Sequence, residues 1–343
     1  HLVVIDPRGL RRYRVPNLLT FEEVSALGAA FEHERPRVVD ERLERQTMDD
    51  IALMIFTSGS TGRPKAAMLS YGNIGAMARG SDEIIRCTPA DSTLSYLPLC
   101  HVAERLMSPV MQLVYGSVVH FAESIDAVTL NLREIGPSFF FGVPRIWEKL
   151  QQQILIRSRD ARPIARRAFE KALAIGTPIA ERSIANGGRP ASARDALVAW
   201  LLRVTVFGNL LASVGLDRVR VSMTGGASIS PSVILFFRAM GVPIYQIYGM
   251  TETSGATHSQ TAAQSRLGWC GPTLPGLVEQ RITDDGELQV RGRIVFNGYL
   301  YDEAATQAAF DDGWLRTGDV VELDAASGQV QIVDRKKAIL ITS

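Results

Sequence analysis

Residues 219–249, VRVSMTGGASISPSVILFFRAMGVPIYQIYG, contain the clearest structural unit of the sequence. A first apolar run ends in a glycine-rich turn, and Ser230 followed by Pro231 has the pattern of a helix N-cap and first turn. The helix is expected to reach Met240, and a second strand to run to Ile247. Strand, helix and strand in this order predict a parallel crossover unit and therefore an α/β protein.

Other apolar runs on the N-terminal side of this unit also have the composition of strands. They cover residues 51–56, 93–97, 117–121 and 138–142, and the first of them is expected to be buried. Residues 143–157, VPRIWEKLQQQILIR, have helical periodicity, with a proline that the first turn tolerates. We therefore expect parallel sheets flanked by helices, in two doubly wound subdomains, over residues 1–270.

The residue pattern of the sequence changes after residue 270. The turn signals DDGE and ASGQ separate the short alternating runs ELQVRG and QVQIVD. This pattern predicts a smaller β-rich subdomain over residues 271–334. Residues 157–204 are helical and mixed in charge, so they form either a solvated helix face or a patch for a membrane surface or a partner.

The composition limits the class of protein. The chain has 343 residues, a formal net charge of +1, 46% hydrophobic residues and 21% charged residues, which is typical of a folded chain with two or three domains or subdomains. The near-neutral charge gives no reason to expect a nucleic-acid partner. Three cysteines without metal-ligand spacing, no signal-peptide pattern and no apolar run of roughly 18 residues favour a cytoplasmic location.

Residues 55–74, IFTSGSTGRPKAAMLSYGNI, form a polar, glycine-rich loop between an apolar run and a helix start that Ser70 or Asn73 can cap. Successive N–H groups and hydroxyls in such a loop can bind an anion, and Lys65 adds a charge that suits phosphate. The spacing differs from the Walker A loop, because Pro64 precedes the lysine and no serine or threonine follows it. The alternative is a flexible turn without a ligand.

Five motifs resemble those of the adenylate-forming superfamily, which includes acyl-CoA synthetases, luciferases and peptide-synthetase adenylation domains. They occur in the family's order and span most of the chain: TSGSTGRPK (57–65), GGA (225–227), YGMTE (248–252), RTGD (316–319) and DRKK (334–337). The resemblance implies that a carboxylate attacks the α-phosphate of ATP, which yields acyl-AMP and pyrophosphate. Catalysis of such a step is mainly positioning and electrostatic stabilisation.

The resemblance assigns catalytic and phosphate-binding roles to individual residues. Lys65 would hold the β- and γ-phosphates, and Glu252 would bind Mg²⁺ together with Ser60 or Thr61. The loop residues implied in nucleotide binding are Thr57, Ser58, Gly59, Ser60, Thr61, Gly62 and Lys65.

Another group of residues would bind adenosine. Tyr248 offers a stacking face for adenine, and Asp319 an acceptor for the ribose hydroxyls. The same resemblance adds Gly225, Gly226, Ala227, Gly249, Thr251 and Arg335, and it places a hinge at Lys337 within residues 335–343. Without the resemblance, Asp319 would be explained as an aspartate that closes a turn.

The segment YLPLCHVAERLMSPV (96–110) and the segment VPRIWEK (143–149) resemble the long-chain fatty acyl-CoA synthetases. In that branch His101 would lie beside the acyl carboxylate, whereas a lone histidine is otherwise more often a structural residue. Members of the family continue past DRKK into a small lid domain. The chain is therefore expected to hold the large domain only, N-terminally incomplete and without the lid.

We therefore expect a long-chain fatty acid–CoA ligase that uses ATP, Mg²⁺ and CoA. The alternatives are a ligase for another carboxylic acid, such as an aryl, medium-chain or sterol side-chain acid, and a non-catalytic nucleotide-binding regulatory module. Peripheral contact with a membrane is compatible with a fatty-acid substrate. Acyl chain length and oligomeric state stay open.

Overall fold

The computed structural model describes residues 1–10, 16–57 and 63–336, and it divides the chain into two compact units, His1–Asp50 and Ile51–Ser343. In the first unit, β1 (Leu2–Val4) pairs in parallel with β2 (Leu18–Thr20), and α1 (Phe21–Glu34) and α2 (Val38–Arg45) follow. Thr20 and Glu23 form a capping box at the start of α1. None of the described residues of this unit is buried, so it has no compact core of its own.

The second unit begins with the antiparallel pair β3 (Ile51–Thr57) and β4 (Lys65–Ser70), which enclose the polar loop. Ser70 caps α3 (Tyr71–Ile85) as predicted, and Asn73 completes the capping box. The expectation that the first strand is buried is wrong, because Met54 and Phe56 are exposed and only one of its residues is buried. A two-stranded ladder that packs on one side leaves alternate side chains uncovered.

The predicted crossover unit is confirmed. Strand β8 (Val221–Thr224) leads through α11 (Pro231–Ala239), which Ser230 caps, to the parallel strand β9 (Ile244–Met250). Strand β7 (Phe139–Phe141) extends this sheet in parallel, and β10 (Gly255–Ser259) adds an antiparallel edge. A separate parallel pair joins β5 (Ser92–Ser95) to β6 (Val118–Phe121). The α/β class predicted from the sequence is therefore confirmed.

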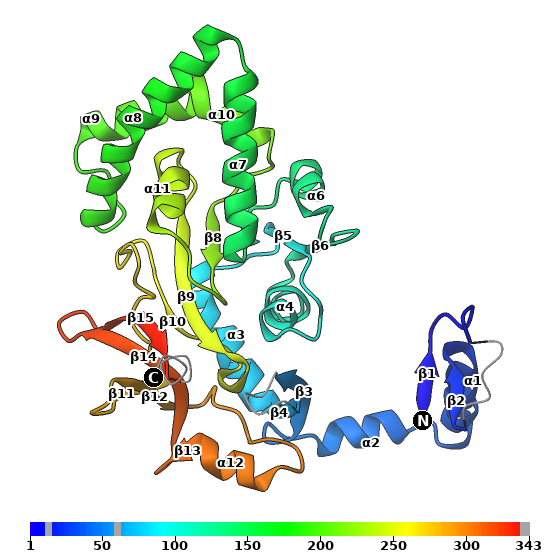
Figure 1. Cartoon of the computed structure of the whole chain (residues 1–343). Coiled ribbons are helices and arrows are strands. Elements are labelled where there is room, and N and C mark those ends of the chain that lie inside the picture. The colour runs from blue at the N-terminus through cyan, green and yellow to red at the C-terminus, as the bar shows by residue number, and fades with distance from the viewer. Residues whose placement is uncertain (11–15, 58–62, 337–343) are drawn as a thin grey trace. The chain divides into compact units, whose positions relative to one another are not determined.

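Helices connect these strands. The chain between β5 and β6 contains α4 (Val102–Arg105), a π turn η1 (Leu106–Val110) and α5 (Met111–Tyr115), and α6 (Val128–Ile135) precedes β7. Between β7 and β8 lie α7 (Pro144–Asp160), α8 (Pro163–Ala185), α9 (Ala193–Leu202), a π turn η2 (Arg203–Phe207) and α10 (Gly208–Ala212). We call the last group the helical cap. Figure 1 shows α7 and α8 of this cap beside α11.

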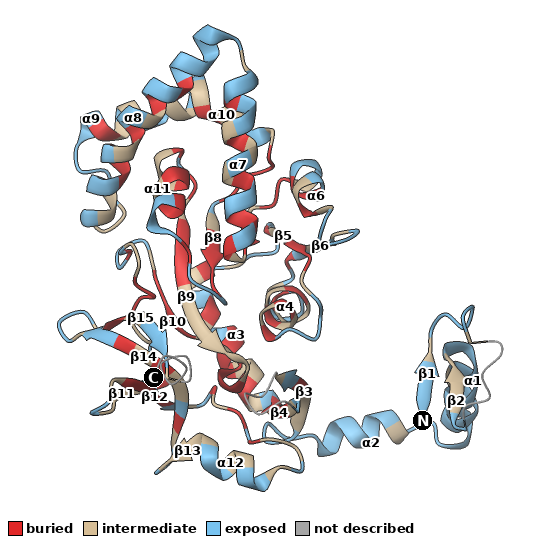
Figure 2. Cartoon of the chain, in the orientation of Figure 1, coloured by how far each residue is buried: buried red, intermediate tan, exposed pale blue. Residues whose placement is uncertain are grey.

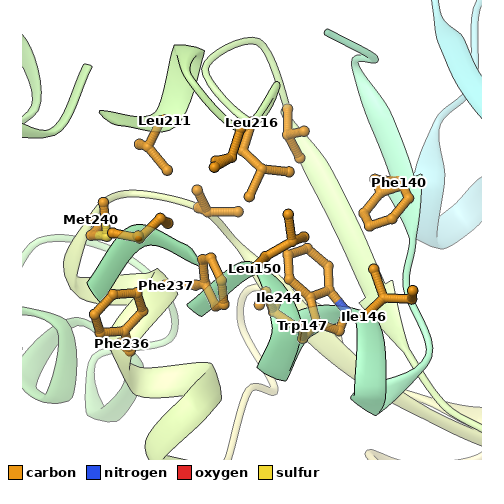
Figure 3. Close-up of a cluster of buried hydrophobic side chains, with 14 of the residues drawn as sticks. Phe140, Ile146, Trp147, Leu150, Leu211, Leu216, Phe236, Phe237, Met240 and Ile244 are labelled. Atoms are coloured by element: carbon orange, nitrogen blue, oxygen red, sulfur yellow. The ribbon is translucent and has the colours of Figure 1, made fainter. Parts of the chain in front are cut away.

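The helical cap is packed on the parallel sheet by a large apolar cluster. Trp147 and Phe237 meet edge to face, with ring centroids 5.1 Å apart. Figure 3 shows these rings together with Leu150, Leu211 and Ile244, which come from the cap and from β9. One helical stretch among the described residues, Ala193–Ala212, is long and apolar enough to cross a membrane, a property that buried core helices share.

The C-terminal part is a five-stranded antiparallel sheet, as the alternating runs predict. It contains β11 (Val278–Ile282), β12 (Glu287–Gly292), β13 (Phe310–Asp311), β14 (Trp314–Asp324) and β15 (Gln329–Arg335), with α12 (Glu303–Ala309) before β13. Its inner side chains share one core with the β3–β4 ladder, where Leu288 and Leu315 cluster with Leu69. The domain boundaries proposed from the sequence, at residues 270 and 334, stay predictions.

Candidate functional site

The polar loop is closed at its base by the β3–β4 ladder. Thr57 lies opposite Lys65 in this ladder, and the Thr57 hydroxyl donates to the Lys65 carbonyl at 3.4 Å. The predicted loop residues Ser58, Gly59, Ser60, Thr61 and Gly62 lie outside the described residues. The structure therefore places the two ends of the loop, Thr57 and Lys65, directly opposite each other.

A segment far along the chain runs beside β4 and holds it in place. We call this segment, residues 294–300, the strap. The Met68 amide donates to the Gly298 carbonyl, and the Asn297 amide donates to the Met68 carbonyl, both at 2.9 Å. The Leu300 amide donates to the Ala66 carbonyl, also at 2.9 Å. Three backbone bonds thus tie the strand that carries Lys65 to the strap.

Tyr299, in the middle of the strap, connects two predicted catalytic residues. Its hydroxyl donates to Glu252 Oε1 at 2.7 Å, and Lys65 Nζ lies 5.3 Å from the centre of its ring. Burial and the neighbouring Glu252 carboxylate raise the pKa of the Tyr299 hydroxyl, so it stays a donor at neutral pH. Tyr299 was not predicted as a site residue from the sequence. The local pattern that could have pointed to it is the triplet NGY, residues 297–299, which follows a β-rich run.

Glu252 is the middle residue of the short helix η3 (Thr251–Thr253), which directly follows β9, and it is buried. The strap also fixes its backbone, because the Phe296 amide donates to the Glu252 carbonyl at 2.8 Å. Oε1 accepts from Tyr299, whereas Oε2 accepts no hydrogen bond from any described residue. Thr251, which the resemblance assigns to nucleotide binding, is the first residue of the same turn.

The fit of Glu252 to Mg²⁺ follows from this environment. The described residues contain no group of three or more His, Cys, Asp or Glu side chains that could hold a metal on their own. One free carboxylate oxygen nevertheless suits Mg²⁺, which commonly takes one or two carboxylates and completes its shell with phosphates and water. Ser60, the other predicted ligand, lies outside the described residues.

Tyr248, Asp319 and Arg335 meet beside the C-terminal part of β9, a few residues before Glu252. The Tyr248 hydroxyl donates to Asp319 Oδ2 at 2.7 Å, and Arg335 Nε donates to Oδ1 at 3.1 Å. Burial, with the Asp319 carboxylate beside it, raises the pKa of Tyr248 well above its ordinary value. Three residues predicted separately for adenosine thus form one connected group on β9, β14 and β15.

The predicted glycines have a structural role that the sequence did not separate from binding. A Cβ on Gly225 would lie 2.9 Å from the Ile247 carbonyl oxygen, and one on Gly249 would lie 1.8 Å from that of Gly255. Gly226 has a φ of +83°, which favours glycine. Gly226 and Ala227 are exposed, so their backbone is accessible to a ligand, whereas Gly225 is buried and serves strand packing.

A buried histidine behind Tyr248 was not predicted. His258 lies on β10 with its ring centre 5.7 Å from that of Tyr248. Its Nε2 lies 2.8 Å from Gln280 Oε1, and the Gln280 amide donates to the Gly328 carbonyl at 3.0 Å. This orientation of the amide makes Nε2 the protonated nitrogen. Burial lowers the pKa of His258 to about 4, so the ring is neutral at pH 7.

His101 lies on a different element from these residues. It is exposed and caps α4, where its Nδ1 accepts from the Ala103 amide at 3.2 Å. The buried Glu104 fixes this turn by accepting from the Leu97 amide at 2.9 Å. The π turn that follows brings Leu106 against Gly255 on β10. The structure therefore connects the His101 helix to the site by packing, and the described hydrogen bonds of His101 stay within its own turn.

Lys336 anchors the end of the described chain. Its Nζ lies 2.8 Å from Glu287 Oε2, while Glu287 Oε1 accepts from the Gly318 amide at 3.0 Å. The residue before the predicted hinge is therefore tied to the turn that presents Asp319. Lys337 itself lies outside the described residues.

The family of the chain follows from comparison with known proteins. A family model described as AMP-binding enzyme matches residues 8–300.

The chain belongs to the AMP-binding enzyme family.

Similar proteins within this family carry the names of fatty-acid ligases. The chain is 33% identical over 341 residues to a protein of Mycobacterium tuberculosis assigned as fatty-acid–CoA ligase fadD11, covering 97% of this chain and 57% of that protein. It is 34% identical over 357 residues to long-chain-fatty-acid–CoA ligase ACSBG2 of Rattus norvegicus, covering 98% and 52%. The chain thus spans little more than half the length of these relatives.

Solved structures of AMP-binding enzymes share the fold. An ATP-bound RpMatB–BxBclM chimera superposes with a TM-score of 0.61 at 25% identity, covering 85% of this chain and 49% of the chimera. A malonyl-CoA ligase with methylmalonyl-CoA and AMP bound gives a TM-score of 0.58 at 27% identity, covering 84% of this chain and 54% of the ligase. The architecture of the large domain predicted from the sequence is therefore confirmed.

Proposed function

We propose that this AMP-binding enzyme is the nucleotide-binding part of a fatty acid–CoA ligase. Such a ligase forms acyl-AMP from a long-chain fatty acid and Mg-ATP, and then transfers the acyl group to CoA. The names of the similar proteins support the fatty-acid class, and the ATP and AMP bound to similar structures support the nucleotide. A cytoplasmic location, with peripheral contact at a membrane, belongs to the same proposal.

One observation carries the proposal. Strand β9 presents Tyr248 toward Asp319 and Arg335, and four residues later the chain presents Glu252 toward Tyr299 and Lys65. Tyr248, which contacts the carboxylate that we propose to bind ribose, and Glu252, which we propose to bind Mg²⁺ at the phosphates, lie four residues apart on one short segment. This arrangement suits a ligand with a nucleoside at one end and phosphates at the other.

The residues of the chain then have separate tasks. The Lys65 ammonium would stabilise negative charge on the β- and γ-phosphates, and Tyr299 would keep Glu252 oriented with one carboxylate oxygen free. Bound Mg²⁺ would neutralise charge on the phosphates. Tyr248 would stack on adenine, while Asp319 would accept from the ribose hydroxyls in place of the Tyr248 hydroxyl that it holds here.

The identity of the acid depends on residues outside the nucleotide group. His101 would lie beside the acyl carboxylate, and its exposure leaves it accessible to a substrate. A ligase for a shorter acid is the second candidate, because one similar structure is a malonyl-CoA ligase. A non-catalytic nucleotide-binding module is less well supported, since Lys65 and Glu252 are both present and connected.

The test is a substrate screen on the whole natural protein. Pyrophosphate release is measured with ATP, Mg²⁺ and acids from malonate and benzoate to palmitate, followed by acyl-CoA formation after addition of CoA. Highest kcat/KM with palmitate supports the proposal. Highest kcat/KM with malonate or benzoate supports the second candidate, and ATP binding without pyrophosphate release with any acid supports the regulatory module.

A further inference from the structure

Strand β14 carries an irregularity that ends in Asp319. In its antiparallel ladder with β12, the three residues of β14 between Arg316 and Val320 lie opposite the single residue Leu288. We call these three residues, 317–319, the bulge. Extra residues in one strand bend the backbone and re-aim the side chains there, so the direction of the Asp319 carboxylate depends on the shape of the bulge.

The backbone of the bulge leaves the ladder and takes other partners. The Thr317 hydroxyl donates to the Leu288 carbonyl at 2.7 Å. The Gly318 amide donates to Glu287 Oε1 at 3.0 Å, and the Gly318 carbonyl accepts from the Lys336 amide at 2.9 Å. Gly318 has a φ of +74°, which favours glycine. The side chain of Glu287 therefore binds the middle of the bulge.

Glu287 also reaches Asp319 from a second direction. It is only 5% exposed, and its Oε2 lies 2.8 Å from Lys336 Nζ. Lys336 directly follows Arg335, whose Nε donates to Asp319 Oδ1 at 3.1 Å. Figure 2 shows buried residues on β12 and β14, and exposed residues at the end of β15 that leads to Lys336. One buried carboxylate thus contacts both the bulge and the residue next to Arg335.

We propose that Glu287 is a positioning residue that makes the protein specific for ribose. The inference rests on the proposed function, in which Asp319 accepts from the ribose hydroxyls of the nucleotide. Asp319 accepts from the Tyr248 hydroxyl in this structure. A ribose hydroxyl takes that place only if the carboxylate keeps its direction, because a hydrogen bond weakens steeply as it departs from linearity.

The charge of Glu287 matters as well as its shape. Burial of a carboxylate costs free energy unless hydrogen bonds and an opposite charge offset the loss of water. Glu287 meets both conditions, because it accepts from an amide and from an ammonium at the same time. The exposed Asp285 contacts the same ammonium at 2.5 Å, but an exposed ion pair contributes little. Glu287 is therefore expected to be the partner that holds Lys336.

The preference for ribose measures this role directly. The whole natural protein is titrated calorimetrically with AMP and with 2′,3′-dideoxy-AMP, which lacks both ribose hydroxyls. Wild type should bind AMP about tenfold or more tightly, since hydrogen bonds to a charged acceptor are lost with the second ligand. Asp319→Ala should bring the two affinities together, because it removes that acceptor.

Glu287→Gln keeps the size of the side chain and an oxygen for the Gly318 amide, but it removes the charge that faces Lys336. It should weaken AMP binding about three- to tenfold and change 2′,3′-dideoxy-AMP binding less than about twofold. A residue that only stabilised the sheet would weaken both ligands alike. Asp285→Asn is the matched control, and it should change both affinities less than about twofold, because its ion pair is exposed.

Lys336→Met breaks the same contact from its partly exposed side and should cause the same selective loss of AMP affinity. Combined with Glu287→Gln, it should add no further loss, because both changes remove one interaction.

Each other result counts against the inference. Equal weakening of both ligands by Glu287→Gln, no change in either, or an equal effect of Asp285→Asn overturns the role of Glu287. Additive losses in the double variant overturn its pairing with Lys336. No AMP binding by wild type would overturn the proposed function itself, whereas a wild-type preference for AMP that survives in Glu287→Gln overturns this inference alone.

Discussion

The two ends of the proposed nucleotide site are built in different ways. At the phosphate end, the backbone of the strap pairs with β4, and among the described residues the side chain of Tyr299 connects Lys65 to Glu252. At the adenosine end, the side chains of Tyr248 and Arg335, from two other strands, both donate to Asp319. The phosphate end is thus positioned mainly by backbone pairing, and the adenosine end by side-chain hydrogen bonds.

This difference predicts how each end responds to substitution. Backbone pairing survives the loss of a single side chain, so a phosphate-end variant should lose chemistry while its strand stays in place. The adenosine end depends on side chains that contact one another around the buried Asp319. A variant there should weaken nucleotide binding and stability together.

The largest effect is expected at the phosphate end. Lys65→Ala and Glu252→Gln should each lower the rate of acyl-AMP formation by the whole natural protein about 10²–10³-fold, because each removes an electrostatic stabiliser of the transition state. ATP affinity should fall less than kcat. Pyrophosphate release measures the rate, with the exposed pair Lys171→Ala and Glu303→Gln as controls. A rate within about threefold of wild type, roughly 0.7 kcal/mol, would contradict the assignment.

The adenosine end should become less stable in acid, because His258 is buried there. In the unfolded chain His258 has a pKa near 6.5, whereas burial lowers the pKa of His258 in the folded chain to about 4. Below pH 6.5 the unfolded chain therefore binds a proton that the folded chain does not. The free energy of unfolding should fall by up to about 3 kcal/mol as the pH drops from 6.5 to 4. Urea unfolding at pH 7.5, 5 and 4 measures it.

The control for this prediction is His258→Gln, which has no titrating ring. The difference in unfolding free energy between wild type and variant should narrow as the pH falls. If the difference in unfolding free energy between wild type and His258→Gln stayed constant from pH 7.5 to pH 4, His258 would not be the cause of the acid sensitivity.

Adenosine recognition gives the next effect. Tyr248→Ala removes the stacking face and should weaken ATP and AMP binding alike by about 1–3 kcal/mol, since both ligands share the base. Tyr248→Phe keeps the face and should bind both nearly normally. Calorimetric titration of the 343-residue chain measures both affinities. If Tyr248→Ala lost affinity for ATP but bound AMP normally, Tyr248 would act on the phosphates and not on the adenine.

The smallest effect separates positioning from direct catalysis. Tyr299→Phe removes one hydrogen bond to the Glu252 carboxylate, a loss of about 1.5 kcal/mol or about tenfold in the rate of acyl-AMP formation. AMP affinity should not change, because the ring and the strap stay in place. If AMP affinity fell as far as the rate, Tyr299 would belong to the fold of the whole site and not to the orientation of Glu252.

Local patterns allowed much of the fold to be predicted. The crossover from β8 through α11 to β9 follows from a cap, a proline and two apolar runs, all of which act within a few residues. The antiparallel sheet follows from alternation and turn signals in the same way. Burial of β3 could not be predicted, because an apolar run does not show on which sides neighbours will pack.

The candidate site shows the same division. Its named residues came from motifs whose order along the chain indicates the family. The structure connects Lys65 to Glu252 through Tyr299 and connects Tyr248 to Asp319 directly, and the roles of these four residues stay predictions. The strap and His258 came from no motif, since they act through contacts with residues far away in the sequence. Tyr299 reaches Glu252 across 47 positions and His258 reaches Gln280 across 22.

The sequence by itself determined the family, the element order and the chemical groups of the site, because these depend on residue type and local spacing. Only the tertiary structure decided which groups touch, which are buried and which stay exposed. Helix α9 is the clearest case: Ala193–Ala212 has the composition of a core helix, yet packing covers one face and leaves Trp200 in solvent. Burial is a property of neighbouring elements, and no single segment encodes its neighbours.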